Sequence, residues 1–245
     1  MNKDKIHIQF IFTRYGYSHN NFIYDVENIY QKKGINYPNT IITNVDIKQS
    51  HELNYFMKKN KIVPDIVICS KLKRAIEIAV ITYKDIVDQV YPVPFIYEFS
   101  NEMKSTKNES DINNLIQYFD NNKLCDVNFS FTKLIENDLI NEKGLDINTL
   151  NTNNFDHFIK YVVSYIIENL QKKGTIKKNI YRIAIVSHYL FLTRHFEVIL
   201  KHTGNEIPTC HNIDTWIEDT VIEYSNNKNV IYSPNKLVNI DQRKN

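Results

Sequence analysis

The chain has 245 residues, of which 42% are hydrophobic and 24% are charged. This length and apolar content are enough for one large domain or two small ones with an ample core. The 30 basic and 28 acidic residues nearly cancel and leave a formal net charge of +2, and no basic stripe interleaved with aromatic residues stands out, so nucleic-acid binding is not indicated.

The cysteines and the apolar runs indicate the cellular compartment to expect for this protein. Cys69, Cys125 and Cys210 are far apart and fit no paired ligand pattern, which argues against a disulfide scaffold or a zinc site and favours a reducing compartment. The polar N-terminus lacks the apolar core of a signal peptide, and no run approaches the roughly 18 apolar residues of a membrane span. We therefore expect a cytoplasmic protein that binds no metal and no membrane.

The apolar pattern predicts strands that alternate with helices, and hence an α/β fold with a mostly parallel sheet. In chain order, the expected elements are a strand at 5–13, helices at 20–33 and 46–60, a strand at 66–69, a helix at 71–83, a strand at 93–99, a helix at 154–172, a strand at 181–187, a helix to about 202, and a terminal hairpin at 219–225 and 229–233.

The middle of the chain differs in composition from the rest. Residues 100–153 are polar and rich in asparagine, with helical fragments near 110–120 and 132–140. Because this stretch has too few apolar positions for a core of its own, we interpret it as a cap or insertion within a single domain spanning residues 1–245.

Chemically suggestive side chains follow the ends of the predicted strands. Arg14 ends the first strand, Arg74 lies one helical turn beyond the second, Glu98 belongs to the third and His188 follows the fourth. Ligands in such sheets gather beyond the carboxyl ends of the strands. Arginine forks suit phosphate oxygens, a histidine can donate to phosphate or transfer a proton, and an acid near the leaving oxygen would complete a phosphomonoesterase.

With these residues in place, the sequence resembles the histidine phosphatase superfamily, the phosphoglycerate-mutase-like proteins. That family opens with a strand and Arg-His-Gly-Glu-Ser/Thr-x-x-Asn, and the same frame here keeps Arg14, Gly16, Ser18 and Asn21. Three later blocks follow in the family's order, and the four blocks together cover about 5–100 and 180–225. The residues they keep are Thr43 and Gln49, then Ser70, Arg74, Ala75 and Ala79, then Ser187 and His188.

The resemblance implies a fold and a set of roles. The fold would be a three-layer sandwich around the mostly parallel sheet, with the polar helical insertion added to it. Phosphate would be bound by Arg14, Arg74, Ser18 and Asn21, without any cofactor. The catalytic residues would be His188, Glu98 as the proton donor, and Tyr15 at the nucleophile position.

Tyr15 departs from the family pattern, in which this position is the histidine that accepts the phosphoryl group. A phenol has a pKa of about 10, so it is mostly protonated and weakly nucleophilic at neutral pH. The phenol also reaches further than an imidazole and would fill part of the position that the phosphate would occupy, called here the phosphate seat. Tyr17 stands in place of the family's acidic residue and Tyr189 in place of its glycine.

Three functions remain open on this sequence. A degenerate, inactive or severely impaired member would bind a phosphorylated small molecule, a phosphoprotein or another protein partner, and the tyrosine replacements favour it. An active phosphomonoesterase would use Tyr15 or a recruited histidine such as His19 as nucleophile, which the retained Arg14, Arg74 and His188 keep open. The third is a structural scaffold without a ligand.

Overall fold

The computed structural model describes a central sheet and helices packed against it. The helix expected at 20–33 lies outside the described residues, as does most of the helix expected to run to about 202. The residues described are 5–14, 42–97, 112–121, 127–146, 155–172, 180–189, 191–193, 195–196, 213, 215–224 and 230–240.

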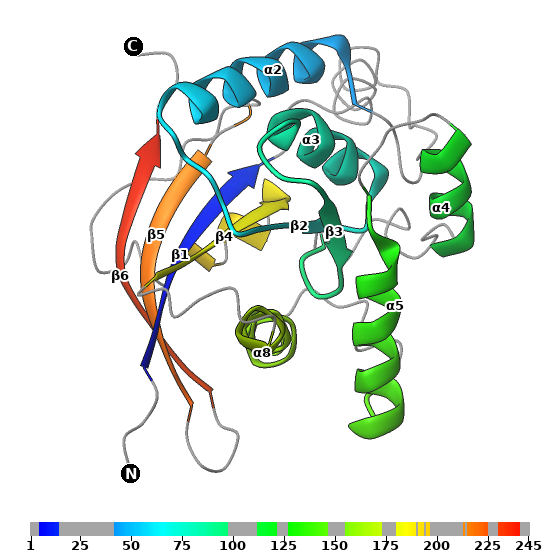
Figure 1. Cartoon of the computed structure of the whole chain (residues 1–245), viewed down its shortest axis with the longest axis vertical. Coiled ribbons are helices and arrows are strands. Elements are labelled where there is room, and N and C mark those ends of the chain that lie inside the picture. Colours follow the sequence, from blue (N-terminus) through cyan, green and yellow to red (C-terminus); the bar gives the residue numbers. More distant parts are fainter. Residues whose placement is uncertain are drawn as a thin grey trace, which may run out of the picture.

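Within these residues the chain forms one six-stranded sheet with the order β3-β2-β4-β1-β5-β6 (Figure 1). Strands β3, β2, β4 and β1 pair in parallel, β5 is antiparallel to β1, and β6 is antiparallel to β5. The predicted mostly parallel sheet is therefore confirmed. The strands are β1 (Lys5–Arg14), β2 (Ile66–Ser70), β3 (Val90–Val93), β4 (Ile180–Ser187), β5 (Thr215–Tyr224) and β6 (Val230–Ile240).

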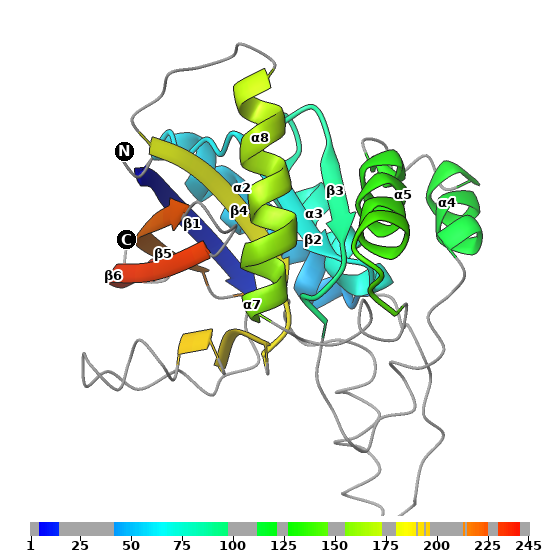
Figure 2. The same cartoon turned by 90° about the horizontal axis from the view of Figure 1, so that it is seen from below.

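Helices lie against both faces of this sheet (Figures 1 and 2). None of those that the structure describes is long and apolar enough to cross a membrane. The three-layer sandwich, as a finer statement of the fold, stays a prediction. The helices are α2 (Asn44–Lys59), α3 (Lys73–Tyr83), α4 (Ile112–Asn121), α5 (Phe129–Asn137) with the π-helix η1 (Asp138–Glu142), and a continuous run of α7 (Phe155–His157), the π-helix η2 (Phe158–Val163) and α8 (Ser164–Lys172).

The alternation of side chains along the strands produces two apolar clusters. Phe10 and Phe12 of β1 pack into one cluster with η2 and α8, whereas Ile11 packs into the other with α2 and α3. Successive residues of a strand point to opposite faces of the sheet. Since β1 is apolar at all three positions, it is covered on both sides, as expected for a strand inside a parallel sheet.

Helix α2 begins with a capping box. The Thr43 hydroxyl accepts a hydrogen bond from the Asp46 backbone N–H at 3.3 Å, and the Asp46 carboxylate accepts one from the Thr43 backbone N–H at 2.9 Å. This reciprocal pair satisfies two backbone donors that have no partner inside the helix. It explains locally why the helix starts here, at a threonine that also matches the family motif.

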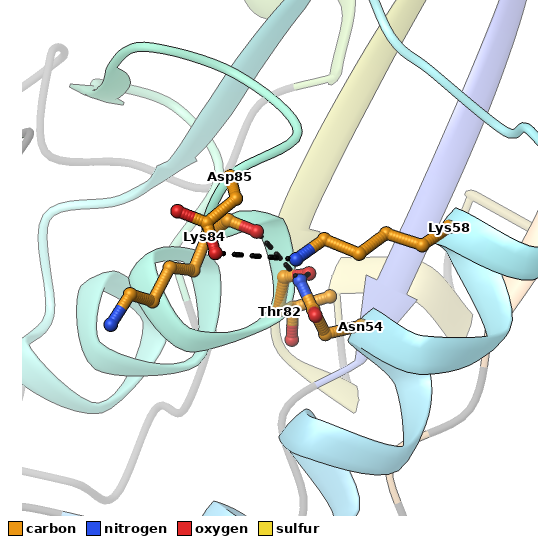
Figure 3. Close-up of polar contacts among 5 residues, drawn as sticks. All are labelled: Asn54, Lys58, Thr82, Lys84 and Asp85. Carbon is orange, nitrogen blue, oxygen red and sulfur yellow. Dashed lines mark hydrogen bonds and ion pairs between the residues drawn. The ribbon is translucent and has the colours of Figure 1, made fainter.

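Helix α2 also holds the C-terminal end of α3 (Figure 3). The side-chain amide of Asn54 donates to the carbonyl oxygens of Thr82 at 2.8 Å and Lys84 at 2.9 Å. The Lys58 ammonium lies 3.3 Å from the Asp85 carboxylate. These contacts supply partners to carbonyls that the end of a helix leaves open, and they fix α3 against α2.

The third strand was predicted wrongly. It was expected at 93–99, but β3 spans Val90–Val93 and the chain turns after it. Pro94 has no N–H to give to a ladder, and Phe95 has a φ of 71°, which no pleated strand accommodates. Ile96, the next residue, lies beyond the strand, and its carbonyl oxygen accepts a hydrogen bond from the Ser187 hydroxyl at 2.8 Å.

The helical fragments expected within 100–153 are present as α4, α5 and η1. Helix α5 packs beside β3, where the backbone N–H of Asn128 donates to the Val90 carbonyl at 2.9 Å and the Thr132 hydroxyl donates to the Pro92 carbonyl. Both α4 and α5 lie on the β3 side of the molecule (Figure 2). The interpretation of residues 100–153 as a cap or insertion stays a prediction.

Candidate functional site

Three neighbouring strands end at one edge of the sheet with motif residues. Strands β1, β2 and β4 end at Arg14, Ser70 and Ser187, and the arrowheads of β1 and β4 point the same way in Figure 1. Arg14 pairs in register with Ser187, and the residue before Ser70 pairs with Val186. Since parallel strands end at a common edge, the motifs meet at the carboxyl side, where ligands of α/β sheets bind.

Arg14 is buried, with 5% of its surface exposed. Its guanidinium carbon lies 5.3 Å from the centroid of the Tyr189 ring, within the range of a cation–π contact. Tyr189 follows His188 directly and occupies the position at which the family pattern has glycine. The aromatic ring therefore takes up one side of Arg14, and an anion at this edge has to share the guanidinium with it.

Arg74 is equally buried, at 4% exposed, in the first turn of α3. The turn starts after Leu72 in an extended conformation and contains no acidic residue. A helix N-terminus carries partial positive charge, so a cation there is unfavourable unless an anion offsets it. The first turn of α3 thus holds two basic residues, Lys73 and Arg74, and no acidic one.

His188 is fully buried after the end of β4. Burial, and next to it the positive charge of Arg74, hold its pKa well below the usual value of 6.5. The imidazole is therefore neutral at pH 7, with one nitrogen able to donate a hydrogen bond and the other able to accept one. The positive charge of Arg74 is therefore close enough to His188 to act on its imidazole.

The structure thus brings both arginines to the pair His188–Tyr189. Arg14 contacts the Tyr189 ring, and Arg74 acts electrostatically on His188. The other predicted site residues lie outside the described residues, and their placement stays a prediction. These are Tyr15, Ser18, Asn21 and Glu98.

The serines of the two later motifs have local structural contacts. The Ser70 hydroxyl accepts a hydrogen bond from the backbone N–H of Leu72 at 3.3 Å, which stabilises the turn that leads into α3. The Ser187 hydroxyl donates to the carbonyl oxygen of Ile96 at 2.8 Å, which holds the chain after β3 beside the end of β4. Both serines therefore build the loops that position the charged residues.

Lys71 is a basic residue at this edge that the sequence analysis did not single out. It is 9% exposed, and its ammonium lies 2.7 Å from the Glu136 carboxylate and 5.5 Å from the Tyr97 ring centroid. The signal for it was the run of basic residues after β2, in which Lys71 and Lys73 precede Arg74. Its ion pair with Glu136 connects the end of β2 to α5.

A second buried histidine, His195, follows His188 along the chain. His195 Nε2 lies 2.7 Å from the Glu218 carboxylate of β5, and the imidazole stacks on the Phe155 ring at a centroid distance of 3.9 Å. The pair ties the chain after His188 to β5 and α7. Among the residues that the structure describes, no group of histidine, cysteine, aspartate and glutamate side chains could hold a metal ion.

No protein-family model and no curated protein sequence matches this chain. Solved structures to which it is similar include a phosphoglycerate mutase from Bacillus anthracis, at 17% identity over 95% of this chain and 93% of that one, with a TM-score of 0.47. Alpha-ribazole phosphatase from Shigella flexneri is 18% identical over 94% of this chain and 95% of that chain, with a TM-score of 0.39.

Phosphoserine phosphatase from Entamoeba histolytica is a further similar structure, at 15% identity over 94% of this chain and 97% of that chain, with a TM-score of 0.40. At these identities and TM-scores the similarities assign neither a fold family nor an activity to this chain.

Proposed function

We propose that this protein is a degenerate member of the histidine phosphatase superfamily that binds a phosphorylated small molecule or a phosphoprotein and hydrolyses it slowly or not at all. The observation that supports the proposal is the burial of both arginines, with Arg14 against the Tyr189 ring and Arg74 close enough to His188 to lower its pKa. Two guanidinium groups and the start of α3 create a positive potential that attracts an anion. The ordered motifs at the same strand ends favour phosphate as that anion.

The proposal includes the parts of the site that the structure does not describe. Ser18 and Asn21 would complete the phosphate contacts, and Glu98 would stand where the family has its proton donor. Tyr15 would occupy the nucleophile position as a protonated phenol, which explains the expected loss of turnover. The three-layer sandwich, the capping role of 100–153 and a cytoplasmic location belong to the same proposal.

The neutral state of His188 favours one alternative, an active phosphomonoesterase. The Tyr15 hydroxyl would give its proton to the neutral His188 imidazole as its oxygen attacks the phosphorus atom, while the leaving oxygen takes a proton from the Glu98 carboxyl. Water, giving a proton to the Glu98 carboxylate, would then attack the phosphorus atom, and the phenol oxygen would leave with the proton held by His188. In a variant of this mechanism His19 would replace Tyr15 as nucleophile. A buried neutral imidazole beside two arginines could take part in the proton transfers of either route.

Binding of inorganic phosphate tests the main proposal. Phosphate at millimolar concentration should raise the melting temperature of the wild type, because a ligand that binds only the folded state stabilises it. Arg14→Ala and Arg74→Ala should abolish the shift. Arg182→Ala is the matched control, since Arg182 of β4 is exposed, and it should keep the full shift.

Two results of this experiment would contradict the proposal. A wild type whose melting temperature does not respond to phosphate contradicts a phosphate-binding function. A shift of the same size in all three arginine variants would show that phosphate acts through general charge screening, and it would also count against a site built from Arg14 and Arg74.

A further inference from the structure

The segment that carries Arg74 is held from outside the sheet by the helices α4 and α5. Arg74 lies within residues 71–77, which join the end of β2 to the first turns of α3. Lys71, Lys73 and Glu77 are the other charged residues of this segment. Each of them contacts a side chain of the polar segment at 100–153.

Helix α5 provides the first contact. The Lys71 ammonium lies 2.7 Å from the Glu136 carboxylate, with side chains that are 10% and 21% exposed. Separating a largely buried ion pair leaves each charge without its partner in a poorly solvated place, which costs free energy. The pair therefore fixes the start of the Arg74 segment relative to α5.

Helix α4 provides the second contact through one tyrosine. The Tyr118 hydroxyl donates to one carboxylate oxygen of Glu77 at 2.8 Å, and the Lys73 ammonium lies 4.1 Å from the Tyr118 ring centroid. The other oxygen of Glu77 accepts from the backbone N–H of Ile42 at 3.1 Å. Burial and the neighbouring Glu77 raise the pKa of Tyr118 to about 12, so the phenol stays protonated and keeps donating.

The contacts matter for Arg74 because they lie on both sides of it along the chain. Lys73 precedes Arg74 and Glu77 follows it by three residues, so all three share the first turns of one helix. A shift of this turn moves the Arg74 guanidinium with it. Recognition of a phosphate by a guanidinium depends on geometry, and a displacement of about 1 Å in such a site can cost about 10²-fold in function.

We propose that Glu136 and Tyr118 are positioning residues for Arg74, so that the docking of α5 and α4 sets the affinity of the pocket for a phosphoryl group. The inference rests on the proposed function and adds its regulation. Release of either helix would weaken phosphate binding without any change to the residues that touch phosphate. A polar insertion of this kind thereby controls a site that is built from other parts of the chain.

Two conservative variants and one matched control test the proposal. Glu136→Gln removes the charge that holds Lys71, and Tyr118→Phe removes the hydroxyl that holds Glu77 while keeping the ring over Lys73. The control is Asp85→Asn, which removes the more exposed ion pair with Lys58 at the opposite end of α3 (Figure 3). Asp85 has a φ of 58°, a conformation that asparagine tolerates well.

The first readout is the dissociation constant for sulfate, a phosphate-like dianion, measured by calorimetry. We expect Glu136→Gln and Tyr118→Phe to weaken sulfate binding about 3- to 10-fold, and Asp85→Asn to change it less than about 2-fold. In an Arg74→Ala background, Glu136→Gln should have no further effect. Lys71→Arg, which keeps the ion pair, should bind sulfate like the wild type.

The second readout needs no ligand. The titration of His188, followed by NMR of labelled histidines and assigned with His188→Gln, reports on Arg74, because the charge of Arg74 lowers the His188 pKa. If Arg74 moves away, the pKa of His188 rises in Glu136→Gln and Tyr118→Phe toward its value in Arg74→Ala. Asp85→Asn should leave it unchanged.

The two readouts separate the two proposals. A wild type that does not bind sulfate or phosphate contradicts the proposed function, and the His188 titration then decides the positioning role alone. A wild type that binds sulfate, together with Glu136→Gln and Tyr118→Phe variants that match it in affinity and in the titration of His188, would overturn the positioning role and leave the proposed function standing.

Discussion

The Arg14 guanidinium lies 5.3 Å from the ring centroid of Tyr189, at the ends of the neighbouring parallel strands β1 and β4. The contact joins a residue that matches the phosphatase motif to one that departs from it. A cation–π contact of this kind contributes about 0.5–2 kcal/mol, depending on how much water is excluded. It therefore competes with a phosphate for the same guanidinium, and the strength of that competition can be measured.

Removing the ring should strengthen anion binding. In Tyr189→Ala the Arg14 guanidinium is released, and we expect the dissociation constant for sulfate to fall about 2- to 30-fold, in line with the contact energy. Calorimetry measures it directly. Tyr189→Phe keeps an aromatic ring beside Arg14 and should stay within about 2-fold of the wild type. Weaker binding in Tyr189→Ala would mean that the tyrosine itself holds the anion.

The buried His188 should make the fold sensitive to acid. Its pKa in the folded protein lies well below the 6.5 of the unfolded chain, so the unfolded state binds more protons as the pH falls below about 6.5. The free energy of unfolding should decrease on acidification by up to about 1.4 kcal/mol per pH unit from this residue. Above about pH 7 the residue is neutral in both states and contributes no pH dependence.

Urea unfolding at several pH values between about 5 and 7.5 checks this linkage. His188→Gln, which cannot be protonated, should show a flatter dependence of the unfolding free energy on pH than the wild type. Since other carboxylates and histidines titrate in both proteins, the difference between the two curves is the quantity of interest. Parallel curves would show that His188 is protonated to the same degree in the folded and unfolded chain.

The contact between α2 and the end of α3 predicts a loss of stability that leaves the site intact. Asn54→Ala removes both hydrogen bonds to the Thr82 and Lys84 carbonyls and should lower the free energy of unfolding by about 1–2 kcal/mol. Chemical denaturation measures the loss. Sulfate affinity should stay within about 2-fold of the wild type, because the first turn of α3 is held elsewhere. A large loss of affinity would show that α3 moves as a rigid unit.

Much of the sheet was predictable because its strands are strongly apolar over short runs. The ends of β1 and β4 were placed correctly for this reason, and with them Arg14, the last residue of β1, and His188, which directly follows β4. The end of the third strand was only partly predictable: Pro94, which has no N–H for a ladder, argues against a strand at 93–99, but nothing in the sequence reveals that Phe95 adopts a φ of 71°. Glycine is the usual residue for that conformation, and its absence hid the turn.

The contacts around Arg74 were beyond the reach of the sequence for a different reason. Lys71 and Glu136 are 65 residues apart, and Glu77 and Tyr118 are 41 apart. Local patterns of spacing report on one helix or strand at a time, so no periodicity connects these partners. The asparagine-rich composition of 100–153 indicated a cap or insertion but did not reveal that two of its side chains reach the start of α3.

The last prediction concerns Tyr15, which lies outside the described residues. If the rest of the pocket is intact, the missing element is one nitrogen nucleophile, and Tyr15→His would supply it and shorten the side chain at the phosphate seat. The wild type should show little or no turnover of an aryl phosphate, and Tyr15→His should gain about 10²-fold or more over it. A further His188→Ala should remove the gain, because proton transfer and charge stabilisation are lost together.

Two results would contradict this account, each in its own way. Robust turnover by the wild type that disappears in Tyr15→Phe would make the phenol a nucleophile and the protein an enzyme with altered chemistry. Robust turnover that survives Tyr15→Phe but not His19→Ala would identify a recruited histidine.

Tyr189 covers one side of Arg14, so a partial rescue in Tyr15→His should become larger in Tyr15→His with Tyr189→Ala. The double variant thus distinguishes a crowded phosphate seat from a missing nucleophile, since only crowding responds to removal of the second ring.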